Sequence, residues 1–209
     1  MTLRDAGETI GLFEPLMVSE GSPKRAELND LALELAARSA AFQASLPASI
    51  ADALAGLIRS MNCYYSNLIE GHNTHPVDIE RAMNDDYSTD PEKRDLQLEA
   101  KAHIAVQKWI DEGGVYGRAT TPNTILDLHR RFCELLPPDL LFVEHPTTGE
   151  RLPVIPGAIR DHDVEIGRHV AVSPGAVHRF LTRLDEAYAR AGRIDSILYA
   201  ACAHHRFLW

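Results

Sequence analysis

The chain has 209 residues, of which 45% are hydrophobic, enough to bury the core of one domain. Its 21 basic and 30 acidic residues give a formal net charge of −9, which argues against a general nucleic-acid or anionic-membrane surface. The three cysteines, Cys63, Cys133 and Cys202, lie about 70 residues apart, which argues against a disulfide framework or a zinc knuckle and favours a reducing compartment.

The first sixteen residues, MTLRDAGETIGLFEPL, contain acidic side chains and no apolar run of signal-peptide length. No later stretch approaches the roughly 20 apolar residues that a membrane-spanning helix needs. We therefore expect a cytoplasmic protein that does not contact a membrane.

Helical spacing of apolar residues predicts helices along most of the chain. After an irregular segment, residues 1–21, the pair Ser22-Pro23 predicts the start of a helix that runs to Pro47. A second helix is expected from Ala48 to Gly71, where glycine would end it. Further helices are expected from Pro76 to about Met83, from Asp90-Pro91 to Gly113, from Thr121-Pro122 to just before Pro137, from Ser173-Pro174 to about Ala191, and from Ile194 onward.

Residues 142–172 differ in composition from the rest of the chain, because glycine and proline recur between short β-branched segments. This pattern predicts a loop with a small hairpin. The fold class expected is therefore all-α, a domain of orthogonally packed helices with a small β-hairpin. We expect three regions: the irregular residues 1–21, a helical region over 22–90, and residues 91–209 with the insert.

Ser66 and Glu70 lie four residues apart, on one face of the second helix. A carboxylate in the last turn faces the negative end of the helix dipole, which costs about 0.3–1 kcal/mol if nothing compensates. An arginine would compensate best, through a charge-assisted bond. The alternative is that Glu70 is a solvated surface residue.

Ser66, Glu70 and Gly71 match the pattern [ST]-x-x-x-E-[GN], and the segment Ser66–Gly71 resembles the inhibitory helix of the Fic family of AMP-transferring enzymes. The resemblance implies that Glu70 pairs with an active-site arginine and occupies the space needed by the γ-phosphate of ATP. It also implies that Ser66 helps to hold Glu70 in place. The position early in the chain resembles the class whose inhibitory helix precedes the catalytic core.

The stretch from Leu152 to Arg160 resembles the approach to the Fic flap, where a P-G-x-[YFI]-R element is common. The flap is a hairpin that holds the target segment by adding it as a strand. The flap residues expected to bind the target are Val154, Ile155, Pro156, Gly157 and Arg160. The alternative is an ordinary surface hairpin.

The last helix, Ile197 to Trp209, resembles the helix that leads into the Fic signature H-P-F-x-D-G-N-G-R-x-x-R. In the family, that signature supplies the general base, the Mg²⁺ ligand and the phosphate-binding loop. It does not occur in these 209 residues, so we expect a Fic-like fold that is incomplete at the C-terminus. We assign no catalytic residue and no metal ligand, and His72-x-x-His75 has no further ligand nearby. ATP and Mg²⁺ are expected to bind the complete family domain, and neither is expected to bind this chain tightly.

The function expected is that of the N-terminal part of a Fic-family protein AMP-transferase, which moves AMP from ATP to a hydroxyl side chain of a target protein and is restrained by Glu70. This chain by itself is expected to be inactive. The alternatives are a non-catalytic helical module that masks a Fic partner in trans, or a helical fragment without activity. The target protein, transfer of a group other than AMP and a homo-oligomer are left open.

Overall fold

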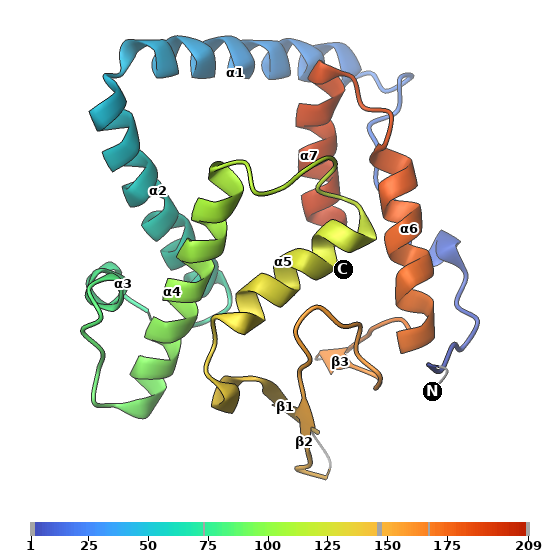
Figure 1. Cartoon of the computed structure of the whole chain (residues 1–209). Helices are drawn as coiled ribbons and strands as arrows, with labels where there is room; N and C mark the ends of the chain where they lie inside the picture. Colours follow the sequence, from blue (N-terminus) through green and yellow to red (C-terminus); the bar gives the residue numbers. More distant parts are fainter. Residues whose placement is uncertain (1–2, 73, 146–147, 167, 208–209) are drawn as a thin grey trace. The chain divides into compact units, whose positions relative to one another are not determined.

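The computed structural model describes residues 3–72, 74–145, 148–166 and 168–207 (Figure 1). Within these residues the chain forms seven α-helices, three short 3₁₀ helices and four short strands. The α-helices are α1 (Arg25–Ser45), α2 (Ala48–Ile69), α3 (Pro76–Met83), α4 (Pro91–Asp111), α5 (Pro122–Glu134), α6 (Val177–Tyr188) and α7 (Arg193–Phe207). The expectation of a mostly helical chain is confirmed at the level of the all-α class.

The helix boundaries follow local capping chemistry. The Asp90 side chain accepts the backbone N–H of Glu92 at 3.1 Å, and Thr121 accepts that of Thr124 at 3.2 Å, so both N-termini begin as predicted. The first helix begins at Arg25 instead of Ser22-Pro23. Ser22 closes a separate turn there, since its carbonyl accepts the Arg25 N–H at 3.0 Å.

The predicted helix after Ser173-Pro174 is divided in two. A 3₁₀ turn, η3 (Pro174–Ala176), precedes α6, and α6 ends at Tyr188, three residues before the predicted end at Ala191. Two other 3₁₀ turns are η1 (Ile10–Phe13) and η2 (Pro138–Leu140).

The insert over 142–172 forms two hairpins within the described residues, where the sequence predicted one. Strands β1 (Phe142–Glu144) and β2 (Arg151–Pro153) pair antiparallel, as do β3 (Glu165–Ile166) and β4 (His169–Val170). The first ladder pairs Phe142 with Pro153, Val143 with Leu152 and Glu144 with Arg151.

Two compact units make up the fold, and each is described by itself. One comprises Met1–Leu46, Arg118–Ile125 and Ile159–Trp209, and the other comprises Pro47–Gly117 and Leu126–Ala158. The three-region division expected from the sequence stays a prediction.

In the second unit, α2, α3 and α4 pack together. Their buried cluster contains Cys63, Ile79, Ala100 and Ile104. Gln97 is also fully buried, and its side-chain amide joins α4 to α3 and to the loop that follows α3. Its Nε2 donates to the Asp78 carbonyl at 3.0 Å, and its Oε1 accepts the Ser88 N–H at 2.7 Å. This packing sets the position of the end of α2.

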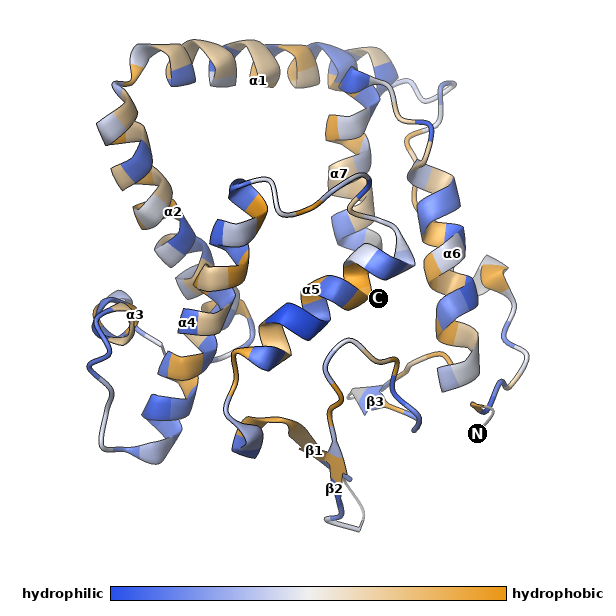
Figure 2. Ribbon diagram, in the orientation of Figure 1, coloured by the Kyte–Doolittle hydropathy of each residue, from blue (hydrophilic) through white to orange (hydrophobic). Residues whose placement is uncertain are grey.

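In the first unit, α1 contacts α7, and the N-terminal segment runs beside α6 (Figure 1). Arg25 is only 7% exposed and forms an ion pair with Asp195 of α7. Farther along α1, large apolar side chains such as Leu35 and Phe42 are exposed. Figure 2 shows hydrophobic residues recurring along this helix. No helix among the described residues has the length and apolar content needed to cross a bilayer.

Candidate functional site

The last turn of α2 ends in a closed hydrogen-bonded cap. Glu70 is the C-cap residue, and Gly71 adopts φ 81°, the left-handed conformation. The His72 N–H donates to the Asn67 carbonyl at 2.8 Å, and the Gly71 N–H donates to that of Leu68 at 3.2 Å. These two bonds are those of a Schellman cap, so the prediction that glycine ends this helix is confirmed.

Ser66 and Glu70 both lie exposed on this last turn. The Glu70 N–H donates to the Ser66 carbonyl at 3.2 Å, as in any helix. Among the described residues, the Glu70 carboxylate has no hydrogen bond and no ion pair, and the Ser66 hydroxyl does not bond to it. The arginine partner expected for Glu70 is therefore not supplied by the described residues.

A second helix in the same unit ends in the same way. At the end of α4, Glu112 is the C-cap residue and Gly113 has φ 82°. The Glu112 carboxylate has a cation one turn back, Lys108, at 3.8 Å. At the end of α2 the residue one turn back is Ser66. Glu70 and Glu112 thus share the same backbone geometry. They differ because a lysine of the same helix lies near the Glu112 carboxylate, whereas no cation of α2 lies near that of Glu70.

Two buried polar residues hold the end of α2 and were missed in the sequence. Asn67 is 6% exposed and Thr74 is 3% exposed, and the Asn67 side-chain amide donates to the Thr74 hydroxyl at 3.2 Å. This bond ties the helix to the turn that follows it. The sequence carries one signal for Asn67: it lies four residues after Cys63, and residues four apart share one face of a helix. In α2 that face is the buried one.

Cys63 is part of that buried stripe. Burial, with a smaller contribution from the Glu99 carboxylate, raises the pKa of the Cys63 thiol to about 11. A thiol with such a raised pKa is not a nucleophile at neutral pH. No group of three or more metal-binding side chains gathers anywhere in the described part of the chain.

The predicted flap residues fall between the two hairpins. Val154 adds one further bond to the first ladder, because its N–H donates to the Leu141 carbonyl at 2.9 Å. Ile155 is exposed, and Pro156 and Gly157 form a turn at which Gly157 has φ 75°.

This turn is fastened to α5. The Gly157 N–H donates to Nδ1 of His129 at 3.0 Å. A Cβ atom at Gly157 would lie 2.8 Å from Cβ of Arg130. Glycine is therefore required here both for its positive φ and for the close approach to the helix.

Arg160 belongs to the other unit. Its side chain joins the two ends of the segment that contains the second hairpin. Its guanidinium donates to the carbonyls of His162, at 2.8 Å, and of Val172. Burial lowers the pKa of Arg160, with nearby acidic groups acting in the opposite direction. The side chain is thus engaged with the backbone of its own segment.

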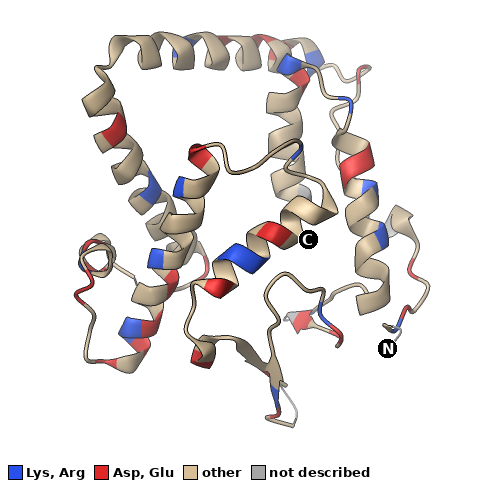
Figure 3. Ribbon diagram, in the orientation of Figure 1, with Lys and Arg blue, Asp and Glu red and all other residues tan. Residues whose placement is uncertain are grey.

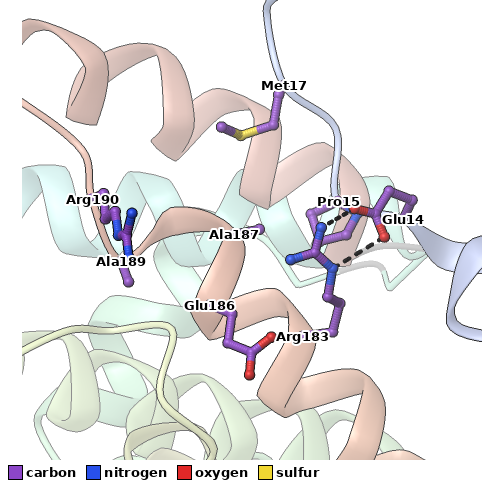
Figure 4. Close-up of a pocket in the computed structure, with 8 residues that line it drawn as sticks. All are labelled: Glu14, Pro15, Met17, Arg183, Glu186, Ala187, Ala189 and Arg190. Carbon is purple, nitrogen blue, oxygen red and sulfur yellow. Dashed lines mark hydrogen bonds and ion pairs between the residues drawn. The ribbon is translucent and has the colours of Figure 1, made fainter.

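A pocket of about 560 Å³ lies between α6 and the N-terminal segment (Figure 4). Its charged lining consists of Glu14, Glu186, Arg183 and Arg190, and Figure 4 shows the Arg183 guanidinium bonded to the Glu14 carboxylate. Two carboxylates and two guanidinium groups leave no net charge, so the lining selects neither anions nor cations.

Comparisons with protein-family models, curated proteins and solved structures find no match to this chain.

Proposed function

We propose that this chain is the part of a Fic-family protein AMP-transferase that carries the inhibitory helix, with α2 as that helix and Glu70 as the inhibitory residue. The proposal is supported by one observation above others. The Ser66–Gly71 motif stands at a rigidly capped helix end, where the Glu70 carboxylate is exposed and has no partner among the described residues.

The physical reason is the contrast with Glu112. A carboxylate at a helix C-terminus is disfavoured by the dipole, and at Glu112 a lysine of the same helix offsets this. Glu70 lacks such an offset and is available to a cation from elsewhere. An arginine that binds ATP phosphate would form a strong charge-assisted pair with it. The same carboxylate would repel the γ-phosphate. The ion pair with the arginine and the repulsion of the phosphate would therefore both oppose the binding of ATP.

The remaining parts of the proposed activity follow from the family resemblance. ATP and Mg²⁺ would be held by the signature loop, which is not in this sequence, so no residue described here is given a catalytic role. The target, a protein with a hydroxyl side chain, would be held along the flap. Within the described residues β1 and β2 form a two-stranded sheet, so each strand keeps an edge to which a target strand can add. We place the protein in the cytoplasm.

The test uses the chain extended beyond Trp209 by a Fic signature and its following helix. Substitution of Glu70 by Gly should raise incorporation of label from α-phosphate-labelled ATP by at least about tenfold, equivalent to about 1.4 kcal/mol. The matched control is Glu112→Gly, which alters the same kind of helix end and should leave labelling unchanged. Equal labelling in the parent and the Glu70→Gly variant would remove Glu70 from this role.

Action in trans is a second candidate, and the exposure of Glu70 favours it equally. In that case the 209-residue chain should inhibit a separate Fic enzyme whose own inhibitory glutamate has been replaced. Inhibition that is lost with Glu70→Gly and kept with Glu112→Gly would select this alternative.

A further inference from the structure

The N-terminal segment, defined here as residues 3–18, is held on α6 and η3 by contacts that span more than 150 residues of sequence. The Gly175 N–H donates to the Arg4 carbonyl at 2.7 Å, and a Cβ atom at Gly175 would lie 2.8 Å from that oxygen. Tyr188 at the end of α6 donates its hydroxyl to the Leu16 carbonyl at 2.8 Å. The segment therefore follows α6 along its length.

A carboxylate of the segment binds Ser173, the residue just before η3. Glu8 accepts the Ser173 N–H at 2.7 Å and the Ser173 hydroxyl at 2.8 Å. The Ser173 hydroxyl in turn accepts the Ala6 N–H at 2.9 Å. Ser173 is only 2% exposed, whereas Glu8 is half-buried, so the chain's own glutamate closes over a buried serine.

Two arginines of α6 bind further acidic groups of the segment. The Arg179 guanidinium contacts both Asp5 oxygens at 3.0 Å and also donates to the Glu8 carbonyl. Arg183, one turn later on the same face, pairs with Glu14. Figure 3 shows basic positions on α6 and acidic positions on the N-terminal segment beside it.

Among the described side chains of the segment, several large apolar ones are exposed. Pro15 is buried, but Leu3, Leu16 and Met17 are exposed. The Asp5 and Arg179 side chains are partly exposed, so their ion pair is screened by solvent and salt. Polar, solvent-accessible contacts of this kind open locally at lower cost than core packing does.

We propose that Arg179 and Arg183 of α6, together with Ser173 just before η3, form a binding site for an extended acidic segment of a partner protein, and that residues 3–18 occupy it as an internal substitute ligand. The bound segment defines the chemistry of the partner. The carboxylates of Asp5, Glu8 and Glu14, at relative positions 1, 4 and 10, bind Arg179, Ser173 and Arg183 respectively. Main-chain groups between them set the register. This site is separate from Glu70 and does not depend on the proposed function.

The test measures binding of a fluorescently labelled peptide with the sequence of residues 3–18 to the full chain by anisotropy. In the parent chain the tethered segment competes at an effective concentration in the millimolar range, so the peptide should bind weakly. The chain variant Asp5→Asn/Glu8→Gln loosens the tethered segment and should bind the unmodified peptide at least about tenfold more tightly, since it loses several charge-assisted bonds. Binding should weaken as sodium chloride is raised.

Three controls make the result decisive. A peptide with the same two neutral substitutions should not bind the loosened chain. Adding Arg179→Ala to that chain should abolish binding of the unmodified peptide. The chain variant Glu27→Gln removes an exposed carboxylate of α1 and should behave as the parent does. Circular dichroism verifies folding, and Glu8→Gln alone replaces the double variant if the latter unfolds. Equal binding of the acidic and neutral peptides, or no binding to a folded loosened chain, would overturn the proposal.

Discussion

At the scale of single residues, two glycines with similar backbone angles differ in what surrounds them. Gly71 has φ 81° and Gly157 has φ 75°. Apart from neighbouring backbone, no atom of the described residues lies within 4 Å of a Cβ built at Gly71, whereas a Cβ at Gly157 would meet Cβ of Arg130 at 2.8 Å. Gly71 is thus needed for its conformation alone, and Gly157 for conformation and space together.

Alanine substitution should separate these two costs. Gly71→Ala should lower the free energy of unfolding by roughly 1–2 kcal/mol, the cost of a left-handed residue with a side chain. Gly157→Ala should cost more, about 2–4 kcal/mol, because overpacking adds to the same backbone cost. Urea unfolding of both variants measures the difference. Equal losses would mean that the contact between Gly157 and α5 is not tight.

At the scale of elements, the N-terminal segment illustrates how an irregular stretch is ordered by charge. The Gly7 amide and then Arg179 hold the pKa of Asp5 below its ordinary value. The Ser173 amide, with smaller help from the Glu8 amide and the Ser173 hydroxyl, lowers the pKa of Glu8. The bonds from Arg179 and Ser173 mean that the ionised carboxyls favour the docked segment, whereas the Gly7 and Glu8 amides belong to the segment itself.

The docked segment should therefore weaken in acid. A carboxyl with a depressed pKa contributes stability that is complete above its ordinary pKa, near 4, and is lost as pH falls through the lower folded value. The stability difference between the parent chain and Asp5→Asn/Glu8→Gln should be largest at neutral pH and should shrink below about pH 4. Urea midpoints for both chains from pH 7 to pH 3 test this. A difference that stays constant over that range would show that these carboxyls do not stabilise the fold.

At the scale of the whole molecule, the proposed function requires more than the 209 residues contain. The sequence has no glycine-rich nucleotide-binding motif and no Fic signature. Under the proposal, Glu70 would pair with an arginine that the signature supplies, and the flap would hold the target protein.

Isothermal titration calorimetry of the 209-residue chain with ATP and Mg²⁺ should therefore show no saturable heat, because no phosphate-binding loop is present. The extended chain with Glu70→Gly serves as the positive control. Stoichiometric, Mg²⁺-dependent binding to the 209-residue chain would contradict this prediction.

The helices were predictable where proline and glycine mark their ends. Pro76, Pro91 and Pro122 begin helices, and Gly71 ends one, because these residues act through local backbone geometry. The second hairpin was missed, since strands of two residues carry almost no periodic signal. Side-chain pairing, whether between Asn67 and Thr74 in adjacent segments or between Glu8 and Ser173 far apart in the chain, depends on packing.

The sequence by itself determined the helical class, most helix boundaries and the Ser66–Gly71 motif on which the proposed function rests. Only the tertiary structure decided that Glu70 is exposed and has no partner among the described residues, that Gly157 is fastened to α5, and that residues 3–18 lie on α6. The physical reason is range. Helix propensity and capping act within a few residues, whereas burial, close approach and ion pairing bring together residues far apart in the chain.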